Sequence, residues 1–266
     1  MDAAQLHDAA HCATIPWNRL LGETFNGILP GGTVVVLGAG PSAREYKRAE
    51  GDYVIACNGA IAQCPDADVW IVAELEALDA PWFPGHADYA GVPVWAVDLA
   101  LCGREYCEKM IALYPGEFLE RVVWYYRRML ESPAGPAIAQ FDIRKHTHGL
   151  VYIDAPEGSE VRGGSVSLNG YQLAAIMGAA KVETYGCEFS YPDGEQHADG
   201  WSPDIAPQTF TTPDGKTYSG SAMLNAHAAA FRQAVQMCAP GGPTLVDHSG
   251  GLLQPAPVKE KVKRGK

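Results

Sequence analysis

A β-branched apolar run that ends in a glycine turn constrains the fold of this chain more than any other feature. Thr33-Val34-Val35-Val36-Leu37 carries no charge and is bounded by glycines on both sides. Such a run is typical of a strand that is buried on both faces of a parallel sheet. Gly38-Ala39-Gly40-Pro41-Ser42 follows directly, and Ser42 to Glu50 is compatible with a helix. Strand, glycine turn and helix begin a βαβ unit, which predicts an α/β fold.

The same glycine turn is the first candidate for a ligand site. Gly38 permits a tight turn, Gly40 lets the backbone approach a phosphate, and Pro41 suits the first helical position. The backbone amides that follow Pro41, from Ser42 onward, would point their positive ends at an anion. We therefore predict nucleotide binding at Gly38, Ala39, Gly40, Pro41 and Ser42. The alternative is an ordinary βα turn, since short glycine motifs give false positives.

The residues after the second strand decide which nucleotide is expected. A dinucleotide site wants an acidic side chain about twenty residues beyond the turn, where it holds a ribose. This chain instead has Cys57-Asn58-Gly59-Ala60. Asn58 can hydrogen-bond a ribose or a base, so Asn58 and Gly59 are assigned to a mononucleotide site, and NAD is not expected.

Further patterns along the chain complete an alternating α/β order. Apolar runs predict strands at residues 53–57, 69–73, 92–97, 150–153, 181–186 and 244–247. Apolar spacing predicts helices at residues 117–130 and 221–238, and one that opens at Gly163-Gly164-Ser165 and ends near Gly178. Residues 188–219 are polar and rich in proline and glycine, which predicts a long loop of the kind that carries function.

The fold expected from this order is Rossmann-like, a mostly parallel sheet with helices on both faces. Residues 30–254 would form one nucleotide-binding catalytic domain with a long active-site loop. Residues 1–29 would be a helical extension, and residues 255–266 a basic disordered tail, since that segment follows prolines and has little to pack.

Composition narrows the classes of partner. The formal net charge is −11, which disfavours nucleic-acid binding unless positive charge is clustered. The seven cysteines include no C-x-x-C pair, which argues against a disulfide scaffold and a zinc site and favours a reducing compartment. With no apolar leader and no long apolar segment, a cytoplasmic protein without membrane contact is expected. A homo-oligomer is compatible with all of this.

The loop after the strand at 181–186 carries the candidate catalytic residues. His197 is the predicted general base or acid, because a histidine titrates near neutral pH. Glu188 lies next to the strand end and would orient a ligand or a metal. His148, on a preceding strand, is the rival for the role of His197. The alternative for this loop is a solvated polar segment.

Phosphate and metal candidates come from three further places. Arg162 precedes Gly163-Gly164-Ser165 and could clamp a phosphate with its guanidinium fork, and these three residues join the predicted nucleotide site. Carboxylates at Glu74, Glu188 and Asp193 could hold a magnesium ion on phosphates. Magnesium is therefore a possible cofactor.

Several motifs together resemble the MptE-like Rossmann family. They are Gly38-Ala39-Gly40-Pro41-Ser42, Ala56-Cys57-Asn58-Gly59-Ala60, Pro65-Asp66-Ala67-Asp68-Val69-Trp70, Gly163-Gly164-Ser165-Val166-Ser167, Met177-Gly178-Ala179, Tyr185-Gly186-Cys187-Glu188-Phe189-Ser190-Tyr191 and Ser249-Gly250-Gly251-Leu252. That family includes 6-hydroxymethylpterin diphosphokinases, and the chain is also similar to bacterial sialyltransferases that use a CMP-sugar. The resemblance covers roughly residues 30–255.

The chain departs from this family at two acidic positions. Glu74 and Glu188 stand where relatives commonly place aspartate. Glu74-Leu75-Glu76-Ala77 also replaces the Asp-Leu-Asp-Gly type run that marks the metal site of the pterin enzymes. The resemblance to the pterin enzymes therefore does not extend to their metal site.

These observations predict a nucleotide-dependent transferase that moves a pyrophosphoryl or glycosyl group to a hydroxyl of a small-molecule acceptor. Its partners would be a nucleotide or nucleotide sugar and that acceptor. The alternatives are a CMP- or UDP-sugar glycosyltransferase that acts on a glycan or a modified nucleic-acid base, and a nucleotide-binding module without catalysis.

Overall fold

The computed structural model of this chain describes residues 21–73, 79–83, 86, 88–96, 109–110, 112–130, 149–153, 165–195, 197–198, 206–212, 215–238 and 241–253. Most of the expected N-terminal extension and the whole basic tail lie outside these ranges. Their helical and disordered character therefore stays a prediction.

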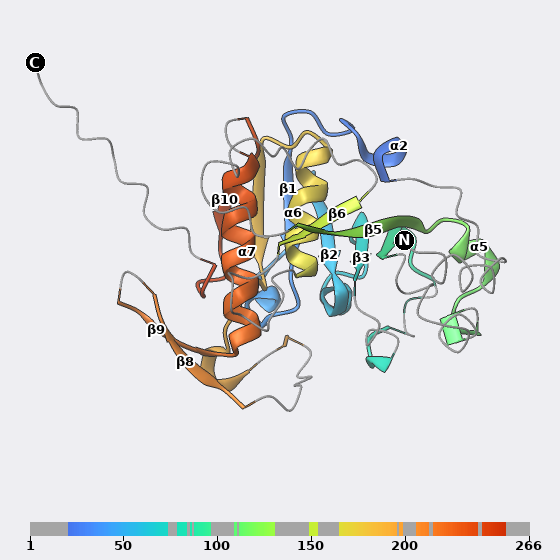
Figure 1. Ribbon diagram of the computed structural model, residues 1–266. Coiled ribbons are helices and arrows are strands. Elements are labelled where there is room, and N and C mark those ends of the chain that lie inside the picture. Colours follow the sequence, from blue (N-terminus) through green and yellow to red (C-terminus); the bar gives the residue numbers. More distant parts are fainter. Residues whose placement is uncertain are drawn as a thin grey trace, which may run out of the picture.

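Within the described ranges, eight strands form one sheet with the order β10-β7-β1-β2-β3-β4-β5-β6 (Figure 1). Every neighbouring pair is parallel. The strands are β1 (Thr33–Leu37), β2 (Tyr53–Cys57), β3 (Val69–Val72), β4 (Val92–Ala96), β5 (Val123–Leu130), β6 (Gly149–Ile153), β7 (Lys181–Tyr185) and β10 (Thr244–Asp247). The predicted α/β, Rossmann-like class is confirmed.

One face of the sheet is covered by α2 (Leu21–Phe25), α6 (Val166–Ile176) and α7 (Ala222–Cys238). Figure 1 shows α6 and α7 side by side on this face. Every residue of α6 is buried, because the helix lies between the sheet and α7. A helix in this position needs no polar face, which fits its mostly apolar sequence; Ser167, Asn169 and Gln172 are its buried polar residues. Among the described residues, no helix combines the length and the apolar character required to cross a bilayer.

The other face is covered by short elements and by aromatic side chains. The 3-10 helices η2 (Pro41–Glu45) and η3 (Asn58–Ala62) and the one-turn helix α5 (Gly116–Leu119) lie here. Trp70 and Trp95 pack edge to face with ring centroids 5.6 Å apart. Such pairs add about 0.5–1.5 kcal/mol beyond their buried area. Large rings therefore fill the space that long helices fill on the first face.

Three local predictions are corrected by this arrangement. The predicted helix at 117–130 is wrong, because only Gly116–Leu119 is helical and Val123–Leu130 is strand β5. Of the stretch from Ser42 to Glu50, only the start lies in a helix, the 3-10 helix Pro41–Glu45. The loop at 188–219 holds the 3-10 helix η8 (Pro192–Gly194) and an antiparallel hairpin of β8 (Gln208–Thr211) and β9 (Thr217–Gly220). Figure 1 shows this hairpin beside the start of α7.

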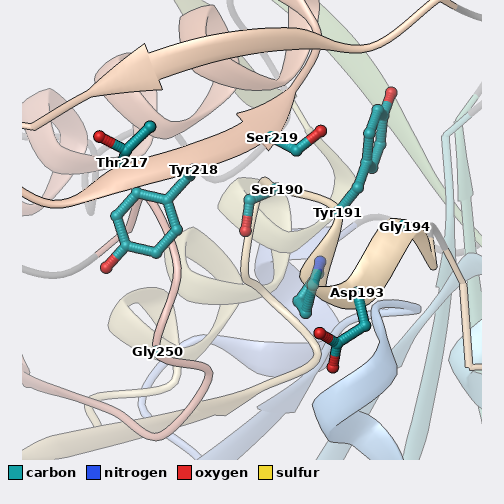
Figure 2. A pocket seen from close by; sticks show the side chains of 9 residues that line it. Ser190, Tyr191, Asp193, Gly194, Thr217, Tyr218, Ser219 and Gly250 are labelled. Atoms are coloured by element: carbon teal, nitrogen blue, oxygen red, sulfur yellow. The ribbon is translucent and has the colours of Figure 1, made fainter.

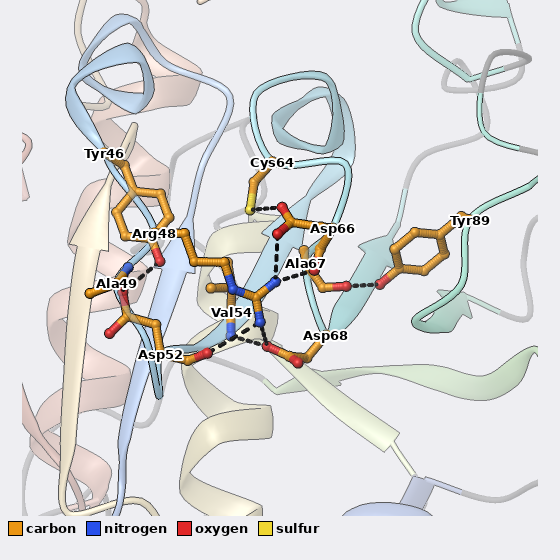
Figure 3. A network of polar contacts seen from close by, with 10 residues as sticks. All are labelled: Tyr46, Arg48, Ala49, Asp52, Val54, Cys64, Asp66, Ala67, Asp68 and Tyr89. Atoms are coloured by element: carbon orange, nitrogen blue, oxygen red, sulfur yellow. Dashed lines mark hydrogen bonds and ion pairs between the residues drawn. The ribbon is translucent and has the colours of Figure 1, made fainter.

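The amino edge of the sheet is held by a network around Arg48 (Figure 3). The Asp68 carboxylate accepts the Val54 amide at 2.7 Å and pairs with the Arg48 guanidinium at 2.7 Å. Arg48 also contacts Asp66, at 3.3 Å between side chains. The segments that enter β2 and β3 are thereby tied together. Because this network lies at the edge opposite the strand ends that carry the glycine turn, its role is structural.

Candidate functional site

The carboxyl ends of β1 and β7 meet at the switch point of the sheet. From β1 the chain proceeds through β2 to β6 in one direction, then crosses back and adds β7 and β10 on the other side of β1. In open α/β sheets the crevice outside such a switch point is where ligands bind. Two glycine turns lie there, Gly38–Ser42 after β1 and Gly186–Glu188 after β7.

The two turns pack against each other through their backbones. Gly38 donates its amide to the Tyr185 carbonyl at 2.7 Å, and Gly40 donates to the Gly186 carbonyl at 2.9 Å. A Cβ on Gly38 would lie 2.2 Å from the Gly186 carbonyl oxygen, and a Cβ on Gly186 would lie 2.2 Å from the carbonyl oxygen of Gly38. Glycine is therefore required at both positions by the contact of one turn with the other.

The Glu188 carboxylate occupies the space beside Gly40. Its Oε1 accepts the backbone amide of Ser42 at 2.6 Å, and a Cβ on Gly40 would lie 1.8 Å from its Oε2. The Ser42 hydroxyl in turn accepts the amide of Gly186 at 2.7 Å. An amide that was expected to face a phosphate thus has a carboxylate partner within the protein. A phosphate could use that amide only by displacing Glu188.

Burial sets the electrostatics of Glu188. Glu188 is only 2% exposed to solvent. Burial raises the pKa of the carboxyl above its ordinary value, and hydrogen bonds from Ser42 oppose part of that rise. Glu188 is therefore a buried acid that holds the two turns together. The role first expected for it, orienting a ligand or metal, would have to be compatible with this bond.

The segment that carries His197 folds back over the first glycine turn. Ala198 donates its amide to the Ala39 carbonyl at 2.8 Å, and its own carbonyl accepts Arg44 Nε at 2.8 Å. Arg44 also pairs with Glu195 at 2.6 Å. His197 is half-buried in this segment. The backbone of this segment is therefore held against the turn after β1.

Asn58 and Ser165 come together at the neighbouring strand end. Cys57 Sγ lies 3.6 Å from the Val166 carbonyl oxygen, so the residues next to each of them, Asn58 and Ser165, face the same edge. Asn58 has a φ of 48° and its side-chain oxygen accepts the Ala73 amide at 3.4 Å. Ser165 caps α6 by accepting the Leu168 amide at 3.2 Å. Both polar side chains therefore have local structural roles at the carboxyl end of β2 and the start of α6.

The remaining nucleotide and metal candidates lie elsewhere in the fold or outside the described residues. Gly59 is buried, and a Cβ there would lie 2.9 Å from the Trp82 ring, so it serves packing. Asp193 is exposed, lies in η8 with a φ of 52°, and lines a separate pocket with the β8–β9 hairpin. Glu74, His148, Arg162, Gly163 and Gly164 lie outside the described residues.

The positions of these residues do not test the predicted metal site. Within the described ranges, no group of three or more His, Cys, Asp or Glu side chains is arranged to hold a metal ion. Because Glu74 is outside those ranges, the magnesium site predicted from Glu74, Glu188 and Asp193 stays a prediction.

Sequence reasoning missed the residues that surround Asp193. The pocket also includes Ser190, Tyr218 and Gly250. One signal was available, because Thr209-Phe210-Thr211 and Thr217-Tyr218-Ser219 flank a Pro-Asp-Gly sequence, which is typical of a hairpin.

Comparison with known proteins gives one finding about the fold. No family model and no curated protein matches the chain. A solved structure, that of the MAf glycosyltransferase from Magnetospirillum magneticum AMB-1, is similar with a TM-score of 0.53 and 15% sequence identity. The alignment covers 92% of this chain and 37% of that protein, so this chain spans little more than a third of its length. A likeness at this identity shows a shared fold.

Proposed function

We propose that this protein is a transferase that moves a glycosyl group from a nucleotide sugar to a hydroxyl of an acceptor. The observation that carries the proposal is the hydrogen bond from the Ala198 amide to the Ala39 carbonyl, which joins the segment that carries His197 to the glycine turn after β1. The solved structure with the same fold is named a glycosyltransferase. The MptE-like motifs and their similarity to CMP-sugar sialyltransferases support the same class.

The proposed site divides into a nucleotide part and a transfer part. Asn58 and Ser165 lie at adjoining strand and helix ends, where a nucleoside can be hydrogen-bonded. Arg162, Gly163 and Gly164 precede Ser165 in sequence and are proposed to contact the phosphate. The donor would then lie across the switch point with its sugar toward His197.

In the proposed reaction, His197 takes up one proton. The acceptor oxygen attacks the anomeric carbon of the donor sugar, and a new carbon–oxygen bond forms. The bond between the anomeric carbon and the phosphate oxygen breaks, and the nucleotide leaves with that electron pair. The proton of the acceptor hydroxyl passes to the imidazole of His197. General base catalysis of this kind typically contributes about 10²–10⁴ in rate.

The environment of Glu188 favours glycosyl over pyrophosphoryl transfer. Pyrophosphoryl transfer relies on divalent ions that bridge phosphates. Glu188, one of the three carboxylates proposed to hold such an ion, is buried and accepts the Ser42 amide. A donor that leaves as a nucleoside monophosphate places less demand on a metal. The test of the proposal is therefore made both with and without magnesium.

The test is a panel of ligands followed by turnover. CMP-, UDP- and GDP-sugars, ATP and NAD are each added with and without magnesium, and the shift in melting temperature is measured. For the donor that binds, release of free nucleotide is then followed. A nucleotide sugar that stabilises the protein and is turned over is the expected result. Stabilisation by ATP alone, or binding without any turnover, would overturn the proposal.

A pair of histidine variants tests the role of His197. His197→Ala should reduce turnover by about 10²–10⁴ while donor affinity changes little. His248→Ala is the matched control, because His248 is also a histidine at the carboxyl edge but stacks on Tyr185, with ring centroids 4.5 Å apart. Equal turnover of His197→Ala and wild type would remove His197 from the mechanism and leave His148 as the candidate.

A further inference from the structure

A pocket opens beside the segment that follows Glu188. It has a volume of about 350 Å³, and its walls are residues 190–194 after β7, the strand β9 and Gly250 after β10 (Figure 2). That volume falls in the range of about 300–1,000 Å³ that is usual for small-molecule sites. The Tyr191 amide donates to the Ser219 carbonyl at 2.7 Å, which fixes the hairpin against the segment after β7. The two main walls are thus held in register by the protein itself.

Ser190 is the residue that points to a ligand. It is 4% exposed, and its hydroxyl has no hydrogen-bond partner among the described residues. The same residue lines the pocket, and Figure 2 shows its side chain between Tyr218 and Asp193. Leaving a buried hydroxyl unpaired is unfavourable, and native proteins rarely do so without a reason. A ligand hydroxyl placed in the pocket would supply the missing partner.

The chemistry of the lining indicates what kind of ligand fits. Hydroxyl groups come from Ser190, Thr217, Tyr218 and Ser219, and Asp193 adds a carboxylate. These groups donate and accept hydrogen bonds, as the hydroxyls of a sugar require. The phenol ring of Tyr218 offers an apolar surface for the face of a sugar ring. Among the described residues that line the pocket there is no lysine, arginine or histidine, so an anionic ligand would meet Asp193 without a compensating charge from them.

We propose that this pocket binds the acceptor, and that the acceptor is an uncharged saccharide. This inference rests on the proposed glycosyl transfer. The position supports it, because Ser190 lies two residues beyond Glu188, and the chain runs on from the pocket to Ala198 over the glycine turn. An acceptor held here would contact the hairpin and the segment after β7, and neither Asn58 nor Ser165 is among the described lining residues. Donor and acceptor therefore have separate binding surfaces.

The experiment is saturation-transfer NMR on the full-length protein with defined sugars. The probes are methyl glucoside, methyl galactoside and methyl N-acetylglucosaminide, with glucuronic acid as the charged counterpart. At least one neutral glycoside should bind, and glucuronic acid should bind at least tenfold more weakly. Ser190→Ala should weaken the neutral glycoside about tenfold without lowering the melting temperature. Thr209→Ala, on the exposed part of the same hairpin, is the matched control and should leave binding unchanged.

A charge variant makes the test specific for the pocket. Asp193→Asn should reduce the preference for neutral sugars, so that glucuronic acid gains affinity relative to wild type. Binding that is insensitive to both Ser190→Ala and Asp193→Asn would overturn the proposal, and so would a wild type that prefers glucuronic acid. If a nucleotide sugar is turned over but no neutral glycoside binds, the acceptor site is wrong while the proposed function stands. If neutral glycosides bind but no nucleotide sugar does, the proposed function fails instead.

Discussion

The contact between Gly40 and Glu188 allows a quantitative test of why the first turn contains glycine. The perturbation is Gly40→Ala, alone and combined with Glu188→Ala. Gly40 has φ −71° and ψ 168°, a conformation that alanine adopts without strain. The added methyl would instead lie 1.8 Å from Oε2 of Glu188, so the carboxylate must move away. That movement breaks the 2.6 Å bond from the Ser42 amide.

The magnitude follows from two opposing effects. Loss of a hydrogen bond to a charged group costs about 1.5–3 kcal/mol. Replacing glycine by alanine where the backbone tolerates it stabilises by about 0.4–1 kcal/mol through the unfolded state. Gly40→Ala should therefore lower the free energy of unfolding by roughly 1–2 kcal/mol in the wild type. With alanine already at position 188, the same change should cost less, because the carboxylate is gone and only the 2.9 Å contact of the added methyl with the Gly186 carbonyl oxygen remains.

Urea unfolding of the four proteins in this cycle measures the coupling energy, which should be about 1–3 kcal/mol. Gly38→Ala serves as the comparison, because its methyl would lie 2.2 Å from a backbone carbonyl oxygen of Gly186. It should destabilise both backgrounds equally. If Gly40→Ala has the same effect with and without Glu188, within about 0.5 kcal/mol, then the carboxylate is not the reason for glycine at this position.

Three further predictions concern single residues. The pKa of the Glu188 carboxyl is raised above 4.5 in the folded state, so the native protein holds this proton more tightly than the unfolded chain does. The wild type should therefore lose stability as the pH rises from 4.5 through the pKa of the folded state. Glu188→Gln, which keeps an acceptor for Ser42, should lack this loss, and melting curves that stay parallel to those of wild type would contradict the assignment. Ser190→Ala should leave the free energy of unfolding unchanged or raise it by up to about 1 kcal/mol, since it removes an unpaired buried hydroxyl; a clear loss in urea unfolding would reveal a protein partner. Asp68→Ala should cost about 1–3 kcal/mol of stability and leave nucleotide-sugar affinity unaltered, and a change in that affinity would argue against a purely structural amino edge.

The central strands were predictable because residue type, apolar character and flanking turn residues all indicate a strand. The runs at residues 33–37 and 53–57 are β-branched, apolar and bounded by turn residues, and each is a strand with the expected limits. Residues 123–130 carried conflicting signals. The spacing of Phe118, Val122 and Tyr125 fits a helix, whereas the run of valine and aromatic residues from Val122 to Tyr126 fits a strand. Because the sheet has side chains buried on both faces, the alternation that would have decided the matter is absent.

The candidate site was harder to predict because its contacts join distant parts of the chain. The turn at Gly38–Ser42 and the acid Glu188 could each be recognised as unusual. Their direct bond, which joins residues 146 positions apart, has no sequence signal. A glycine that makes room for a carboxylate gives the same local pattern as a glycine that makes room for a phosphate. Ser190 was overlooked for the related reason that an unpaired hydroxyl can be recognised only when its surroundings are known.

The position of β1 at the switch point also has a consequence for synthesis of the protein. One edge of β1 pairs with β2, which follows within twenty residues, while its other edge pairs with β7. At about 5–20 residues per second, the ribosome needs roughly 7–30 s to proceed from Ser42 to Glu188, which are 146 positions apart. Throughout that interval the apolar run at Val34, Val35 and Val36 has a strand edge without its partner, which is a surface prone to association with other chains. This edge of β1 is covered only when β7, residues 181–185, has been made and pairs with it.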